Sequence, residues 1–159
     1  MKQKRGYLIA VLLLGLTSMF SLVHAEQNDQ QKPNVMILLD EMHPIGYYVR
    51  PIDAGYYIAL LNDSVEVYLP YKGRVYQSDF SHEGLDMRKA IYGYSSHLNK
   101  KGRREINFCC KRNCVEYRFR VTLHPQGKAY VQLHPSNAQA ISYSGDWEYG
   151  TAVPRRNRP

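Results

Sequence analysis

The sequence is poor in cysteine, in tryptophan and in long apolar segments. With 3 cysteines and 1 tryptophan in 159 residues it is no disulfide-rich scaffold, and a chain of this length can bury a core without disulfides or metals. It contains no glycine-rich phosphate loop, no Gly-x-Ser-x-Gly elbow and no His-Glu-x-x-His spacing. We therefore expect no catalytic residue, no metal and no cofactor.

The only long apolar run belongs to an apparent export signal at residues 1–25. Three basic residues precede this run, which is short for a membrane span, and Val23-His24-Ala25 is a small-x-small cleavage site. The residue directly after Ala25 is not cysteine, which disfavours a lipid-anchored form. We predict cleavage after Ala25 and a periplasmic or secreted protein with no transmembrane segment; an uncleaved anchor is the alternative.

Cleavage would change the charge balance of the chain. The formal net charge is +7, and residues 1–25 contain three of the 21 basic residues and none of the 14 acidic ones, so +4 remains. The remaining length corresponds to one domain. Residues 26–33 and 150–159 are polar and contain proline, so we expect a flexible N-terminal segment and a disordered basic tail around a β domain at residues 34–149.

Apolar residues in that domain recur with a period of two and almost nowhere with the period of a helix. Turn residues at positions 62–63, 100–102 and 125–127 separate the alternating runs into hairpins. We predict a mostly-β fold with a single antiparallel meander sheet of about seven to nine strands, curled or closed into a barrel. Residues 79–89 lack the strand pattern, and we expect a polar loop or one short helical turn there.

The turns also predict how the strands pair. They place Leu60 opposite Val65 and Val121 opposite Val131, which are apolar on both strands. Strand parity puts Tyr117 and Tyr143 in the core. The hairpin around residues 100–102 should carry its apolar side chains on one face, namely Tyr92, Tyr94, Leu98, Ile106 and Phe108.

The three cysteines lie close together around one predicted turn. Parity puts Cys110 on the core face with Phe108 and puts Cys109 on the opposite face. A four-residue loop would pair Cys109 with Cys114, whereas a three-residue loop would set Phe108 opposite the charged Glu116. For an exported protein we therefore predict a Cys109–Cys114 disulfide, with Cys110 inward and free. A redox role or metal ligation by the cluster is the alternative.

Positive charge is concentrated between residues 100 and 120, which hold eight basic and two acidic residues. Alternation places Arg118 and Arg120 on the wet face of the sheet, with Tyr130 and Gln132 opposite them. Arginines beside aromatic rings suit nucleic acid, but an exported protein does not meet that ligand. We predict a face that binds an acidic protein, a glycan or a lipid headgroup; a solvated face without a partner is the alternative.

One ordered set of motifs resembles a family signature. Residues 69–76 read Leu-Pro-Tyr-Lys-Gly-Arg-Val-Tyr, and a Lys-Lys-Gly turn, an alternating strand, a glycine turn and Ile-Ser-Tyr-Ser-Gly at residues 141–145 follow. This order resembles an exported Gram-negative bacterial family catalogued as domain of unknown function 4251, over about Val35 to Trp147. Lys72 departs from the usual aromatic residue. The family has no established catalytic residues, so the resemblance implies none here.

Tyrosines exceed the number that half-buried strands need, and the excess suggests contact surfaces. We therefore add Tyr71, Arg74 and Tyr76 of the signature segment as candidate binding residues, and note Tyr47-Tyr48 as a further aromatic pair. Our main hypothesis is a non-catalytic binding module of the envelope or the secreted fraction. A carrier that encloses a small apolar ligand is the alternative, and a hydrolase that uses His82-Glu83 is a third.

Overall fold

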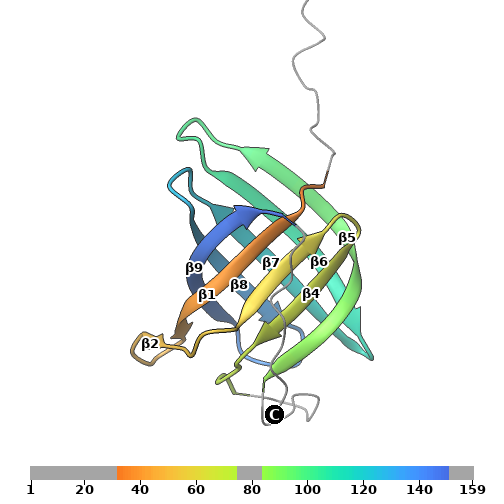
Figure 1. Cartoon of the computed structure of the whole chain (residues 1–159). Helices are drawn as coiled ribbons and strands as arrows, with labels where there is room; N and C mark the ends of the chain where they lie inside the picture. The colour runs from red at the N-terminus through yellow and green to blue at the C-terminus, as the bar shows by residue number, and fades with distance from the viewer. Residues whose placement is uncertain (1–31, 75–83, 151–159) are drawn as a thin grey trace, which may run out of the picture.

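The computed structural model describes residues 32–74 and 84–150, which form a single antiparallel β barrel (Figure 1). These residues contain no helix, and so none that is long and apolar enough to cross a membrane. The strands are β1 (Val35–Pro44), β2 (Arg50–Pro51), β3 (Tyr57–Leu61), β4 (Ser64–Leu69), β5 (Leu85–Leu98), β6 (Arg104–Arg112), β7 (Val115–Leu123), β8 (Lys128–Pro135) and β9 (Ile141–Tyr149).

Pairing of the first strand with the last closes the barrel. Eight described strands follow one another around it in the order β1-β3-β4-β5-β6-β7-β8-β9, and β1 pairs with β9 from Val35 opposite Tyr149 to Pro44 opposite Ile141. The short β2 pairs only with the second half of β1. The prediction of one antiparallel meander of about seven to nine strands, curled or barrel-like, is confirmed.

Alternate side chains of the strands fill the interior. Tyr117 and Tyr143 are fully buried, as predicted, and the rings of Phe108 and Phe119 stack with their centroids 4.9 Å apart. An eight-stranded barrel has an interior just wide enough for side chains to fill. Because these rings occupy the space that a ligand would need, the packing gives the carrier hypothesis no support.

Two hairpins have the registers that the sequence predicts. Leu60 lies opposite Val65 across β3 and β4, and Val121 lies opposite Val131 across β7 and β8. The backbone of Asn62 is left-handed, with φ of 51°, as a two-residue turn between β3 and β4 requires. Apolar pairs on both strands and suitable turn residues were sufficient to define these registers.

The β6–β7 hairpin has a different register from the predicted one. A two-residue turn at Asn113-Cys114 replaces the expected four-residue loop, and it sets Cys109 opposite Arg118. Asn113 adopts a left-handed backbone, with φ of 54°, which asparagine tolerates well. The register that the Cys109–Cys114 disulfide needed is therefore wrong, and both residues are free thiols. Cys110 is buried and also free.

The prediction of a loop or helical turn at residues 79–89 is wrong for residues 85–89, which begin β5. Leu85 and Met87 are buried, whereas Asp86 and Arg88 are exposed, so the period of two is present. The alternation is weak in the sequence because this stretch holds only two apolar residues among charged ones. Residues 79–83 lie outside the described residues.

A bulge in β5 changes which side chains point inward. The register against β6 shifts between Tyr92 and Ser95, around Gly93, whose φ of +61° is left-handed. Ile91 is buried, while Tyr92, predicted on the core face, lies on the outer face and is exposed. Tyr94 packs against the core, as predicted. The bulge was not visible in the alternation of the sequence.

Candidate functional site

Arg118 and Arg120 lie on the outside of the barrel, in a hollow of about 490 Å³ over β5 to β8. We call this the arginine hollow. Gly93, at the bulge of β5, leaves open space where another residue would have a side chain. The remaining polar side chains of the lining include no carboxylate: Ser95, Asn107, Cys109 and His134.

Strand register explains why the two arginines come together. Arg118 lies between Cys109 of β6 and His134 of β8, and Arg120 lies between Asn107 and Gln132. The arginines occupy successive outward positions of β7, about 7 Å apart along the strand. The sequence predicts that Gln132 lies opposite the arginines, and in the structure it is directly opposite Arg120.

Arg118 is held in place by a carboxylate. Its Nε donates a hydrogen bond to Glu116 Oε1 at 2.6 Å, and Glu116 Oε2 accepts one from the hydroxyl of Tyr92 at 2.8 Å. The hydrogen bond from Tyr92, followed by that from Arg118, lowers the pKa of Glu116. The same bond to Glu116 raises the pKa of Tyr92 to about 12. Glu116 is therefore charged near neutral pH, and its hydrogen bond orients Arg118.

Arg120 differs from Arg118 in having no such partner. Its side chain is exposed, and within residues 32–74 and 84–150 it forms no hydrogen bond or ion pair. The neighbouring Cys109 is a thiol whose pKa is raised, mainly by burial, so it adds no negative charge near neutral pH. The arginine hollow thus combines one oriented and one unpaired guanidinium group.

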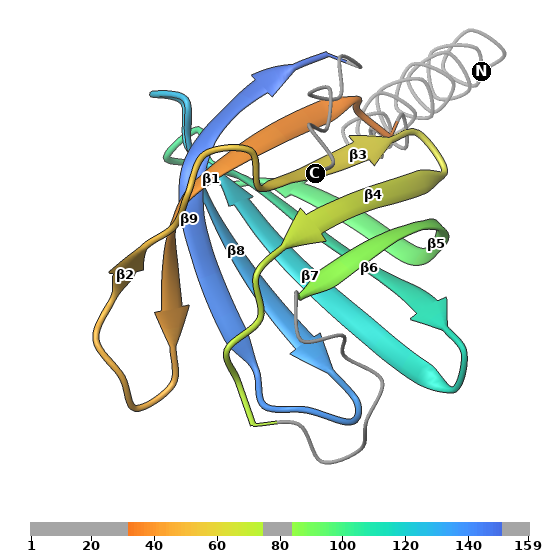
Figure 2. The same ribbon diagram turned by 60° about the horizontal axis from the view of Figure 1, so that its bottom comes forward.

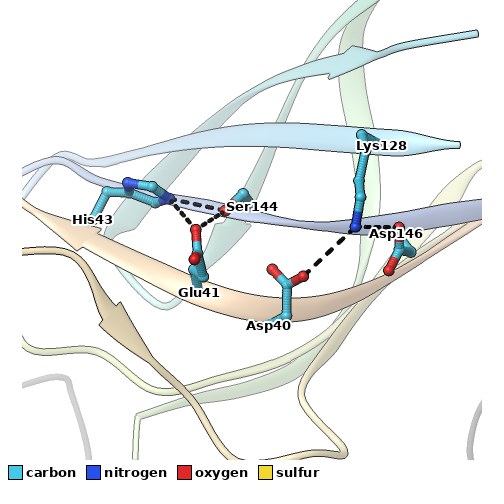
Figure 3. Close-up of polar contacts among 6 residues, drawn as sticks. All are labelled: Asp40, Glu41, His43, Lys128, Ser144 and Asp146. Atoms are coloured by element: carbon cyan, nitrogen blue, oxygen red, sulfur yellow. Dashed lines mark hydrogen bonds and ion pairs between the residues drawn. The ribbon is translucent and has the colours of Figure 1, made fainter. Parts of the chain in front are cut away.

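A second outer hollow, of about 480 Å³, lies over the pairing of β1 with β9 and extends over the neighbouring β8 (Figure 3). We call it the seam hollow. The Nζ of Lys128 is 2.7 Å from Asp146 Oδ1 and 3.9 Å from Asp40 Oδ2. The hydrogen bond to Asp146 is the main cause of the raised pKa of Lys128. All three side chains are more than half exposed, so solvent screens these pairs strongly.

Glu41, His43 and Ser144 form a polar cluster beside this lysine (Figure 3). Ser144 Oγ lies 2.9 Å from His43 Nε2 and donates to Glu41 Oε2 at 3.0 Å. Glu41 lies 3.6 Å from the same Nε2. In a nucleophilic triad the acid holds the other ring nitrogen and the serine proton goes to histidine. The cluster therefore lacks the geometry of a serine nucleophile.

Tyr130 belongs to the seam hollow rather than to the arginine hollow. Its ring lies 5.9 Å from that of His43, edge to face, and its strand partner in β7 is Thr122. The structure therefore divides the predicted binding residues: Arg118 and Arg120 share one hollow, and Tyr130 lines the other.

The signature segment has a structural role where it is described. The hydroxyl of Tyr71 donates to the backbone carbonyl of Gln139, and the ring packs against the core. The backbone carbonyl of Arg74 accepts a hydrogen bond from the Gln139 N–H at 2.9 Å, while the Arg74 side chain is exposed. Tyr76 and the His82-Glu83 pair lie outside the described residues. Tyr71 thus fastens the connection between β4 and β5 to the loop between β8 and β9.

Sequence reasoning missed the seam hollow. Glu41 and Ser144 meet only because β1 pairs with β9, and nothing local to either strand indicates that pairing. The one available signal was Gly145 in the Ile-Ser-Tyr-Ser-Gly motif. A Cβ on Gly145 would lie 1.9 Å from the carbonyl oxygen of Leu38, so glycine is needed where the seam bulges.

No group of three or more His, Cys, Asp and Glu side chains in the described ranges could hold a metal ion. Both hollows are lined by charged and hydrogen-bonding side chains. The arginine hollow suits carboxylate or phosphate groups, because guanidinium binds these in a planar, two-pronged geometry.

Comparison with known proteins gives a family and a fold. The model of the family described as a domain of unknown function (DUF4251) matches residues 31–147. No curated protein matches the chain. A crystal structure of a DUF4251 family protein from Bacteroides eggerthii DSM 20697 is similar, with a TM-score of 0.59 and 10% sequence identity over 74% of this chain and 80% of that one. At this identity the likeness concerns the fold alone.

Proposed function

The chain belongs to the family described as a domain of unknown function (DUF4251), and this description gives no function, so we propose one from the surface of the protein. We propose that the protein is a non-catalytic binding domain of the periplasm or the secreted fraction. The anionic group of an acidic glycan, protein or lipid headgroup lies between Arg118 and Arg120. The observation that carries this proposal is the arginine hollow, which is lined by two arginines at successive outward positions of β7.

The chemistry of the hollow favours an anion over other ligands. Arg118 uses its Nε to bind Glu116, which leaves the outer edge of its guanidinium directed to solvent. Arg120 contributes a second positive charge one outward position further along β7. Asn107 and Ser95 supply neutral hydrogen-bonding groups at the margin. A carboxylate or phosphate can thus replace water on both arginines.

Export and the absence of catalysis are parts of the same proposal. Export rests on the basic start, apolar run and cleavage site of residues 1–25, which lie outside the described residues. The geometry of Glu41, His43 and Ser144 supports a binding role rather than an enzymatic one. Ser144 donates its proton to Glu41 and not to His43, so the cluster lacks the proton transfer that a serine nucleophile needs.

The test compares two double variants that remove the same charge. Arg118→Ala/Arg120→Ala removes both arginines of the hollow, and Lys100→Ala/Lys101→Ala removes two exposed lysines from the β5–β6 turn. Each protein is loaded on an immobilised polyanion such as polyglutamate and eluted with salt. We expect the arginine variant to elute at clearly lower salt than both wild type and the lysine variant, because local geometry adds to net charge.

A pull-down from cell envelopes with the same three proteins then identifies the partner. Partners retained by wild type and by the lysine variant, but lost by the arginine variant, are those that bind the hollow. If the two variants shift alike in salt elution and retain the same partners, the positive charge acts only as a solvated surface and the proposal is wrong.

A further inference from the structure

The hairpin that joins β1 to β2 ends in a group of exposed apolar side chains. We call residues 45–49 the hairpin tip: Ile45, Tyr47, Tyr48 and Val49 are 55%, 61%, 92% and 51% exposed. The tip projects away from the barrel (Figure 2). Of the eight large apolar or aromatic side chains exposed within the described ranges, four lie in these five residues. Such a concentration marks an interaction surface.

The base of the hairpin is well anchored, so the exposure is not a consequence of a loose segment. Met42 and Pro44 are buried at the end of β1, and Ile52 packs against the core. The Ile52 N–H donates to the carbonyl of Asp40 at 3.0 Å, and the Tyr47 N–H donates to that of Pro44 at 3.3 Å. The barrel therefore holds the apolar tip out from its surface.

Basic residues outnumber acidic ones at this end of the barrel beyond the hairpin itself, whose base also carries Asp40 and Glu41, the latter opposite Pro51. Arg50 is the only charged residue between positions 43 and 52. The antiparallel order brings the end of β6, the start of β7 and the ends of β4 and β8 to the same end of the barrel as the tip. In the described ranges 42–53, 69–74, 84–88, 110–117 and 134–141, the basic residues Arg50, Lys72, Arg74, Arg88, Lys111 and Arg112 outnumber the acidic Asp53, Asp86 and Glu116.

We propose that this end of the barrel docks onto an anionic lipid bilayer, with the hairpin tip inserted among the headgroups. Exposed apolar residues occur at the consecutive positions 47, 48 and 49 of a hairpin that projects from the barrel. A flat protein surface would cover one side, whereas a fluid bilayer surrounds a convex projection. Tyrosine is favoured at the membrane interface, and basic residues next to it attract anionic headgroups.

The test is co-sedimentation with vesicles of phosphatidylcholine that contain about one-third phosphatidylglycerol. Wild type, as recovered from cells, is compared with Tyr47→Ser/Tyr48→Ser and with the control Leu98→Ser/Tyr149→Ser. The control also removes two exposed apolar side chains, 60% and 63% exposed, but at the other end of the barrel. Any contribution of residues 1–25 is the same in all three proteins, so differences between them report the tip.

We expect the tip variant to partition onto these vesicles about tenfold less than wild type, equivalent to about 1.4 kcal/mol, and the control to bind like wild type. Binding of wild type to pure phosphatidylcholine should be weaker because the basic residues then have no anionic partner. Equal binding of the tip variant and the control would overturn the proposal. So would loss of a protein partner by the tip variant without any change in vesicle binding, which would assign the tip to a protein groove. Unchanged thermal melting of both variants establishes that they fold.

Discussion

The phenol of Tyr143 donates a hydrogen bond of 2.6 Å to the backbone carbonyl of Pro70. Tyr143 is the tyrosine of the Ile-Ser-Tyr-Ser-Gly motif in β9, and Pro70 belongs to the Leu-Pro-Tyr segment that follows β4. The two residues lie 73 positions apart in the chain. These two sequence motifs therefore meet at one end of the barrel, where Tyr71 and Gln139 make a similar contact.

Replacing Tyr143 with phenylalanine should destabilise the protein by about 1–2 kcal/mol, because the partly buried carbonyl of Pro70 loses its donor. Urea unfolding monitored by circular dichroism measures the change. Tyr149→Phe is the matched control in the same strand, since its ring is exposed, and should be within about 0.5 kcal/mol of wild type. Equal stabilities of the two variants would show that the contact is not stabilising.

Gly145→Ala should open the seam between β1 and β9. The new methyl group would lie 1.9 Å from the carbonyl oxygen of Leu38 and 2.8 Å from its carbon, so one strand has to move. We expect a loss of stability of about 3 kcal/mol, at the upper end of the range typical of overpacking. Ser142→Ala in the same strand serves as the control. Amide hydrogen exchange of β1 should accelerate in Gly145→Ala alone; unchanged exchange would contradict this account.

The three thiols should differ in reactivity. Burial raises the pKa of Cys110 to about 12, and burial also raises the pKa of Cys109, while Cys114 is exposed. Near pH 8, roughly one Cys110 thiol in ten thousand is ionised. Iodoacetamide should therefore label Cys114 first and Cys109 more slowly, and should label Cys110 only after unfolding. Mass spectrometry counts the labels; native protein that resists labelling at both Cys109 and Cys114 would contradict the free thiols.

The lowered pKa of Glu116 makes a small part of the stability depend on pH. Its folded pKa lies below the ordinary 4.5, so this contribution is present above pH 4.5 and is lost as the pH falls through the folded value. Tyr92→Phe and Arg118→Ala each remove one of its hydrogen bonds and should raise the pKa of Glu116 towards 4.5. NMR titration of the Glu116 carboxyl group measures the shift; Arg120→Ala should leave it unchanged.

Local signals in the sequence predicted most of the strand pairing. Leu60 and Val65 flank a turn whose asparagine accepts a left-handed backbone, and their apolar character defines the face that each strand buries. The same reasoning failed for the β6–β7 hairpin. Loops of two and of four residues both pair core with core there, and choosing the longer one moved Cys109 from Arg118 to Cys114.

Features that depend on distant strands were beyond local reasoning. The bulge at Gly93 places Tyr92 on the outer face, and it is recognised only from the shift in register between β5 and β6. The seam hollow exists because Glu41 and Ser144 come from the two ends of the domain. Arg118 and Arg120 were found because alternation within a single strand puts both on the wet face. The exposure of the hairpin tip depends on β1 extending beyond its pairing with β3.

The pairing of β1 with β9 also determines when the domain can fold. While the chain is being made, every other strand of the barrel can pair with the neighbour that precedes it, but one side of β1 has no partner until Tyr149 has emerged. Contacts between such distant segments form slowly, and an open strand edge invites other chains. The barrel can therefore close only after β9 has been synthesised, and a chain that stops before β9 leaves one edge of β1 unpaired.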